Sequence, residues 1–313
     1  MVERHMSRIE RALGILIEEL RRAIAVSATA PFAHAPYPLA NTMVHRGDPG
    51  LLGPGSVSWM VIADIAAFVG GIRGLLIQAA HPEVVAGVGD HSRYREDPLG
   101  RLSRTSAYVT ATTFGAMPEV EQAIRQVVRI HRVVKGVSSR GIPYSADDPA
   151  FSAWVHNALT DSFVTTHLAY GGIRLSEAES DRFVAEQTRI GALLGAHPMP
   201  ETRDDLSSWI EDHPSLGPSP EMEDAVAFLT DPPLAPTIKL GYRVLLEAAI
   251  STVPGRIKDI LSVSPALAAV PVGRPAVAAL RWALGYSPSW RLALERCDEE
   301  VPEQLFKQRP RVA

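Results

Sequence analysis

Apolar residues recur every three to four positions along most of the chain, which is the spacing of helices with one buried face. The first such stretch runs from Ser7 to Ala28 and is followed by a loop rich in Pro, Gly and His over residues 29–56. Alternating apolar and polar positions, the mark of a half-buried strand, do not extend beyond a few residues. The apolar positions of the first predicted helix are Ile9, Leu13, Leu16, Leu20 and Ile24.

Local signals place the ends of several further helices. Asp97-Pro98 and Asp148-Pro149 each offer an N-cap carboxylate followed by proline at the first helical position, and Ser176 with Glu179 forms a capping box. Glycines at 115 and 171 are suitable stops. The predicted helices after the apolar segment described next span residues 98–114, 118–136, 149–170, 177–195, 202–211, 220–229, 240–251, 255–261, 275–284 and 288–297.

The segment from Val57 to Ala80 is the most apolar part of the chain, and it ends at His81-Pro82. It carries Asp64 and Arg73, and two ionised groups would cost several kcal/mol in a membrane-spanning helix. We therefore expect a buried central helix and no stable membrane insertion. Together these patterns predict an all-α fold, a single large helical bundle formed by one domain over residues 1–313, with shorter proline-separated helices in its C-terminal part, 212–300.

Composition narrows the possible functions. With 46% hydrophobic and 21% charged residues, 313 residues can bury a sizeable core. A net charge of -4 without a basic stripe gives no reason to expect a nucleic-acid partner. The single cysteine, Cys297, excludes an internal disulfide and an all-cysteine metal site. The first residues lack the apolar core of a signal peptide, so we expect a cytoplasmic protein.

His131 is the first candidate for chemistry. On the helix predicted from Pro118, Val120, Ile124 and Val127 define an apolar face, and His131 takes the next place on it. A lone histidine on such a face more often makes a core hydrogen bond than binds a metal. A neutral imidazole in an apolar wall is, however, what a five-coordinate haem iron requires.

A second candidate group, Arg101, Arg104, Thr105 and Tyr108, falls near one face of the helix that begins at Pro98. Two guanidinium groups and hydroxyls on one stripe can bind carboxylates, such as haem propionates or an anionic substrate. The competing interpretation is a solvated polar face. Spacing alone leaves both open.

The positions of the remaining candidate histidines in the sequence favour structural roles for them. His156 and His167 lie on one stripe of their helix, too far apart to share a metal ion, and we expect one core and one surface histidine. His81 ends the apolar helix, where a protonated imidazole would cap the C-terminus. The sequence has no Glu-x-x-His, His-Glu-x-x-His, Walker, Gly-x-Ser-x-Gly or Cys-x-x-Cys-His motif, so any haem would be held without thioether bonds.

Several motifs in order resemble those of one known family. They are the segments 76–82 (LIQAAHP) and 91–105 (HSRYREDPLGRLSRT), residues 128–136 around His131, then 143–146 (PYSA), 148–149 and 154–156 (WVH). The segment 57–211 resembles the MpaB and latex-clearing-protein family of oxygenases, which use haem as a cofactor. This resemblance implies an all-helical, globin-like core around non-covalent haem b, and a reaction with dioxygen.

The resemblance also implies roles for individual residues. In latex-clearing protein a histidine binds the iron on one side, and an Arg-x-x-Lys-Thr segment lines the other, its lysine able to bind iron. The matching segment here is Arg101 to Thr105, and His131 best matches the iron-binding histidine. Arg104 replaces the lysine, and a guanidinium cannot readily donate a lone pair to iron. The expected iron is therefore five-coordinate or water-ligated, with Arg101 and Arg104 orienting dioxygen, a propionate or the substrate, and Thr105 donating a hydrogen bond.

These observations predict a haem b-dependent oxygenase or oxidase that acts with dioxygen on a small or moderately apolar molecule. The alternative is a non-enzymatic helical protein that holds haem or a lipid, and a more remote one is peroxidase-like activity. The substrate and the oligomeric state stay open. The expected catalytic residues are Arg101, Arg104 and Thr105, the metal ligand is His131, and the expected cofactor-binding residues are His131, Arg101, Arg104, Tyr108 and His156.

Overall fold

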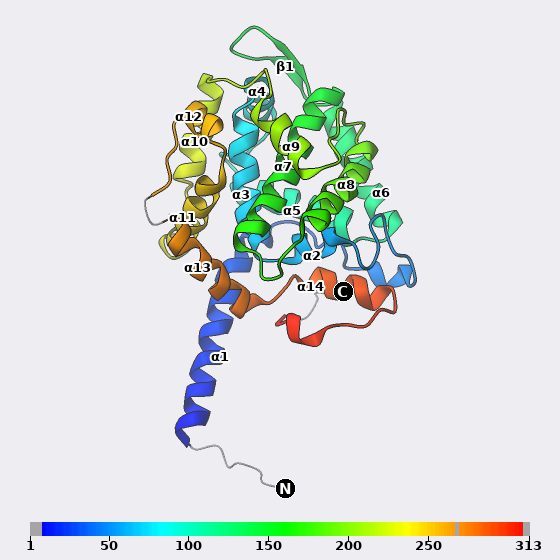
Figure 1. The fold of residues 1–313 in the computed structure, drawn as a ribbon, viewed down its shortest axis with the longest axis vertical. Helices are drawn as coiled ribbons and strands as arrows, with labels where there is room; N and C mark the ends of the chain where they lie inside the picture. Colours follow the sequence, from blue (N-terminus) through cyan, green and yellow to red (C-terminus); the bar gives the residue numbers. More distant parts are fainter. Residues whose placement is uncertain (1–7, 267–268, 309–313) are drawn as a thin grey trace.

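The computed structural model describes residues 8–266 and 269–308 and confirms the all-α fold. In this part of the chain, fourteen α-helices accompany three short 3-10 helices and one two-stranded hairpin (Figure 1). The elements are α1 (Arg8–Thr29), η1 (Ala30–Phe32), η2 (Thr42–His45), α2 (Val57–Ala63), α3 (Ala66–Ala79), α4 (Pro82–His91), α5 (Pro98–Phe114), α6 (Met117–His131), β1 (Lys135–Val137), β2 (Pro143–Ser145), α7 (Pro149–Tyr170), α8 (Glu177–Leu193), α9 (Arg203–Glu211), α10 (Pro220–Thr230), α11 (Pro236–Thr252), α12 (Gly255–Leu261), α13 (Ala269–Leu284), α14 (Pro288–Arg296) and η3 (Glu303–Leu305).

The centre of the body is the pair α3 and α7, which pack against each other along their length. Two glycines of α3 allow this close approach: a Cβ at Gly70 would lie 2.7 Å from Phe163 Cδ1, and one at Gly74 would lie 2.8 Å from Leu159 Cδ2. Figure 1 shows α10 to α13 on one side of this pair and α6 and α8 on the other, with α1 extending away from the body. The central pair therefore forms the frame on which the outer helices are placed.

The apolar segment 57–80 is not one helix, as we had expected, but two, because α2 and α3 meet at a bend of 88°. Asp64 explains the break. Its buried carboxylate accepts hydrogen bonds from the backbone N–H groups of Ala66 (2.8 Å) and Gly172 (2.9 Å) and pairs with Arg281 (2.7 Å). In the described residues no single helix has the length and apolarity to cross a membrane, although α2 and α3 taken together meet those two criteria.

Two other expectations are corrected near the candidate site. Pro82 ends the apolar segment but also begins a new helix, α4, since proline fits the first helical position. The helix expected to run to Gly136 ends at His131, and Lys135–Val137 pairs with Pro143–Ser145 in an antiparallel hairpin. The strands are three residues long, too short for an alternating pattern to reveal them.

Helix boundaries elsewhere follow the capping signals. Asp97 accepts a hydrogen bond from Gly100 N–H, Asp148 accepts one from Ala150 N–H, and Ser176 and Glu179 form the predicted capping box. In the C-terminal part, α11 and α13 each begin earlier than predicted, and α13 continues through Pro275. The N-terminal residue of the first predicted helix, Ser7, lies outside the described residues.

Candidate active site

The C-terminal end of α4 forms hydrogen bonds with the segment that follows α6 and with Arg101 on α5. The ring Nε2 of His91, the last residue of α4, donates to the carbonyl of Lys135 (3.0 Å), which follows the end of α6 at His131 by four residues. Ser92, the next residue of the chain, accepts a hydrogen bond from the Arg101 guanidinium. These two hydrogen bonds join the C-terminal end of α4 to strand β1 and to Arg101 on α5, and neither of them involves His131.

His131 is half-buried rather than on the fully buried face that the apolar spacing had predicted. The cause is that α6 ends at this residue, so no further turn of helix covers it. Burial lowers the pKa of the imidazole, against the opposing effects of Asp147 and of a backbone hydrogen bond with Ala146. Burial therefore favours the neutral form of this ring.

Arg101 is also half-buried, and its guanidinium has an unusual environment. Its hydrogen-bond partner is the hydroxyl of Ser92, and within the described residues no carboxylate forms an ion pair with it. Burial, and then the charge of Arg104, lower the pKa of Arg101. This positive charge is consequently held near an apolar region without a compensating negative charge.

Arg104 and Thr105 differ from Arg101 although they belong to the same predicted stripe. Both side chains are exposed, and Arg104 Nη1 pairs with Asp97 Oδ2 at 3.1 Å. The Arg104 guanidinium holds the pKa of the Asp97 carboxyl below its usual range. The structure therefore brings Arg101 to the interior and leaves Arg104 and Thr105 on the surface of α5.

Tyr108 lies two turns beyond Arg101 on α5. Its hydroxyl is fully enclosed, and in the described part of the chain it has no hydrogen-bond partner. Burial raises the pKa of this phenol, which stays protonated. An enclosed hydroxyl without a partner is rare in folded proteins, so it calls for an additional donor or acceptor.

His156 and His167 are both buried, so the expectation that one of them would be a surface histidine is wrong. The Nε2 of His156 forms a hydrogen bond with the carbonyl of Gln187 on α8 (2.9 Å), and that of His167 with the carbonyl of Ile173 (2.8 Å). Burial lowers the pKa of His156 to about 4. A backbone partner on α8 explains why a histidine can be enclosed at position 156.

His81 is not a protonated C-terminal cap, because it lies at the N-terminal boundary of α4 and is buried. Its ring packs near Phe151, Trp154 and His213, at centroid distances of 5.5, 5.6 and 5.3 Å. Burial, and then the charge of His213, lower its pKa to about 4. The ring is thus neutral and belongs to an aromatic cluster.

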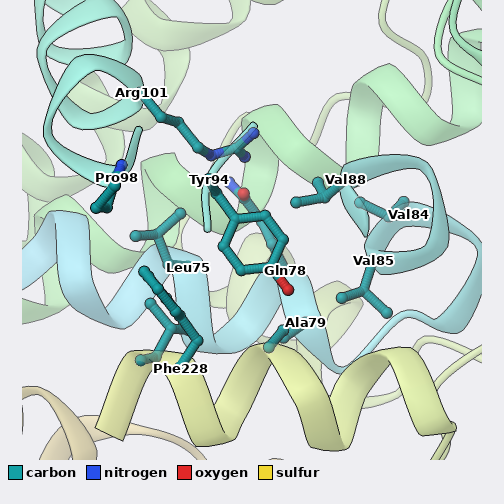
Figure 2. Close-up of a pocket in the computed structure, with 12 residues that line it drawn as sticks. Leu75, Gln78, Ala79, Val84, Val85, Val88, Tyr94, Pro98, Arg101 and Phe228 are labelled. Atoms are coloured by element: carbon teal, nitrogen blue, oxygen red, sulfur yellow. The ribbon is translucent and has the colours of Figure 1, made fainter. Parts of the chain in front are cut away.

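A pocket lies beside Arg101, between α3, α4, α5 and α10, with a volume of about 100 Å³. Figure 2 shows the Arg101 side chain directed toward Tyr94 and Val88, with Phe228 on the opposite wall. Apart from Arg101 and Gln78, its other lining side chains are apolar or aromatic. Sequence reasoning missed this pocket, since Phe228 lies far from the motifs, although Tyr94 was inside one of them.

The described residues contain no group of three or more His, Cys, Asp or Glu side chains that could hold a metal ion. This part of the chain therefore offers no cluster of ligands for a metal ion bound mainly by protein side chains. A metal whose ligands come mostly from an organic cofactor needs only one side chain. His131 is suitable for that role, because burial favours its neutral ring.

Comparison with known proteins identifies the chain's relatives. Two mycobacterial proteins described as uncharacterized, from Mycobacterium bovis and Mycobacterium tuberculosis, are each 32% identical over 127 residues, which is 38% of this chain and 48% of the relative. The match thus spans about half the length of these curated relatives. No solved structure matches the chain. Residues 59–282 match the family described as ER-bound oxygenase mpaB/B'/rubber oxygenase, catalytic domain, and the chain belongs to this oxygenase family.

Proposed function

We propose that this protein is a haem b-dependent oxygenase in which His131 is the protein ligand to the iron. Family membership supports an oxygenase, and with it a small-molecule substrate and dioxygen. One observation supports haem: His131 is a half-buried imidazole at the end of α6, and its burial favours the neutral ring that can bind iron.

A porphyrin requires fewer protein ligands than a bare metal ion, and the described residues offer no cluster of three or more such ligands. A porphyrin supplies four nitrogen ligands of its own, so one imidazole completes a five-coordinate iron. The enclosed Tyr108 hydroxyl lacks a partner in the described residues. Arg101 supplies a positive charge beside the pocket for an anionic group of the substrate.

In the proposed mechanism haem supplies the redox and dioxygen chemistry, and the protein supplies binding and orientation. His131 anchors the iron, and the pocket beside Arg101 excludes water from an apolar part of the substrate. Arg104 cannot serve as an iron ligand because its guanidinium stays protonated. Arg104 and Thr105 are exposed, so they take part only where cofactor or substrate covers that side of α5.

The apolar lining of the pocket also favours a second candidate function, the holding of a lipid without turnover. The two functions differ in oxygen consumption. An oxygenase loaded with haem consumes dioxygen when its substrate is supplied, whereas a binding protein does not consume it with any candidate substrate.

The test of the proposal is haem uptake, followed by absorption in the Soret region. Full-length wild-type protein should bind one haem per chain. His131→Ala should reduce haem occupancy by at least tenfold while the circular dichroism of its helices is unchanged. The matched control is His197→Ala, which removes an exposed histidine from the loop after α8 and should leave haem binding intact. Absence of haem binding in the wild type, or equal binding by His131→Ala, would contradict the proposal.

A further inference from the structure

The charge of Arg101 differs from that of the fully buried arginines. Arg73 pairs with Asp161 at 2.6 Å, and Arg296 has a Glu119 oxygen within 4.0 Å. Arg101 is partly removed from water as well, yet its hydrogen bond goes to the neutral hydroxyl of Ser92. A guanidinium near an apolar region without an anionic partner is unfavourable unless a ligand supplies the missing negative charge.

The pocket next to this guanidinium is built mainly from apolar groups. Leu75 and Ala79 of α3, Val88 of α4 and Phe228 of α10 are among its walls. Tyr94 lies in it with its ring packed edge-on against Phe228, at a centroid distance of 5.0 Å. Water in such a place makes few hydrogen bonds, so an apolar group displaces it favourably.

The size of the pocket limits what it can hold. A volume of about 100 Å³ accommodates a short hydrocarbon segment. The residues that line the pocket do not include His131, so the pocket is distinct from the proposed iron site, and its occupant is a small molecule or the end of a chain.

We infer that this pocket binds an amphiphilic carboxylate, with its hydrocarbon chain between α3, α4 and α10 and its carboxylate on Arg101. A planar guanidinium can bind both carboxylate oxygens at once, which fixes the orientation of the ligand. Such a molecule meets both needs of the site, because its charge compensates Arg101 and its chain covers the apolar walls. The identification of this ligand class with the substrate of the oxygenase rests on the proposed function, whereas binding itself does not.

The experiment is a calorimetric titration of the full chain, with and without added haem, using octanoate, octanol and octylamine as probes. Octanoate should bind at least tenfold more tightly than octanol, and octylamine should bind most weakly because its charge repels Arg101. Arg101→Gln should weaken octanoate binding at least tenfold and change octanol binding less than about twofold. Ala225→Phe, which fills the pocket from α10, should weaken both.

The matched control is Arg93→Gln, which removes the same charge from an exposed position in the neighbouring loop and should leave octanoate binding unchanged. The inference is overturned if octanoate does not bind, or if Arg101→Gln and Arg93→Gln behave alike. It is also overturned if haem abolishes octanoate binding, because Arg101 would then be the partner of a haem propionate. A chain that binds octanoate but no haem would contradict the proposed function and leave this inference standing.

Discussion

Two arginines in different parts of the molecule, Arg73 and Arg101, show how the same side chain serves two purposes. Arg73 lies in the α3–α7 core, where its guanidinium donates to Asp161 (2.6 Å), to the Ser162 hydroxyl (2.9 Å) and to the carbonyl of Thr252 (3.1 Å). Arg101 lies in the first turn of α5, where it donates to one neutral hydroxyl, that of Ser92. The fold therefore supplies an anionic partner for the Arg73 guanidinium, and the described residues supply none for that of Arg101.

This difference separates structural from functional charge. In the core, a buried charge is tolerated because its partner and its hydrogen bonds are already in place. In the first turn of α5, the described residues provide no anionic partner for the Arg101 charge. An uncompensated charge costs stability, and its presence beside a pocket is typical of a site that a ligand completes.

The largest effect on the free energy of unfolding is expected when the Arg73 charge is removed. Arg73→Met should lower the free energy of unfolding by about 3–5 kcal/mol, because it leaves Asp161 buried without a partner. Chemical denaturation measures this loss. The double variant Arg73→Met/Asp161→Leu should recover much of it, and a cost below about 1 kcal/mol for Arg73→Met would contradict the assignment.

The buried His156 should make stability depend on pH. Its pKa in the folded protein is about 4, below the 6.5 of an exposed histidine, so the folded state favours the neutral ring. The resulting stability is complete above pH 6.5 and is lost as the pH falls toward 4.

Between pH 7.5 and pH 5 the loss from His156 should be about 2 kcal/mol, at 1.36 kcal/mol for each unit of pKa shift. His156→Gln keeps an N–H donor for the Gln187 carbonyl. Because glutamine does not titrate, the unfolding free energy of this variant should fall less between pH 7.5 and pH 5. Equal pH dependence in wild type and variant would show that His156 is not the responsible group.

Replacement of Arg101 by methionine should not lower the free energy of unfolding, in contrast to Arg73→Met. Arg101→Met should leave the unfolding free energy of the ligand-free protein unchanged or raise it by up to about 1 kcal/mol, since an uncompensated charge is replaced by an apolar chain. Denaturation with the Arg73→Met protein in parallel gives the comparison directly. A loss of 2 kcal/mol or more would mean that Arg101 stabilises the fold.

The smallest effect is expected at Arg104. Its side chain is exposed and its ion pair with Asp97 lies at the surface, so Arg104→Met should change the unfolding free energy by less than about 0.5 kcal/mol. Thermal unfolding of the variant is sufficient to check this. A larger loss would indicate that the Asp97–Arg104 pair is needed to hold the start of α5.

The sequence could predict most helix boundaries because caps are local. The Asp97-Pro98 and Asp148-Pro149 signals lie within a few residues of the helices they begin. The break at Asp64 could not be predicted, because its partners Gly172 and Arg281 are 108 and 217 residues away. The charges of Asp64 and Arg73 were visible, but the pairs they form depend on tertiary structure.

The candidate site was predicted only in outline. His131 and Arg101 were identified from spacing and motif, but the half-burial of His131 depends on where α6 ends. The division of the α5 stripe places Arg101 beside the pocket between α3, α4 and α10 and leaves Arg104 and Thr105 exposed, which no helical spacing reveals. Phe228 enters the pocket from α10, more than one hundred residues after Arg101.

The most direct test of the central claim is chemical rescue of the iron ligand. Full-length His131→Gly protein should lose the Soret absorption of bound haem, and added imidazole should restore it by entering the space left by the side chain. Wild-type protein should show no such dependence on imidazole for haem retention. Full haem binding by His131→Gly without imidazole would contradict the assignment of His131 as the iron ligand.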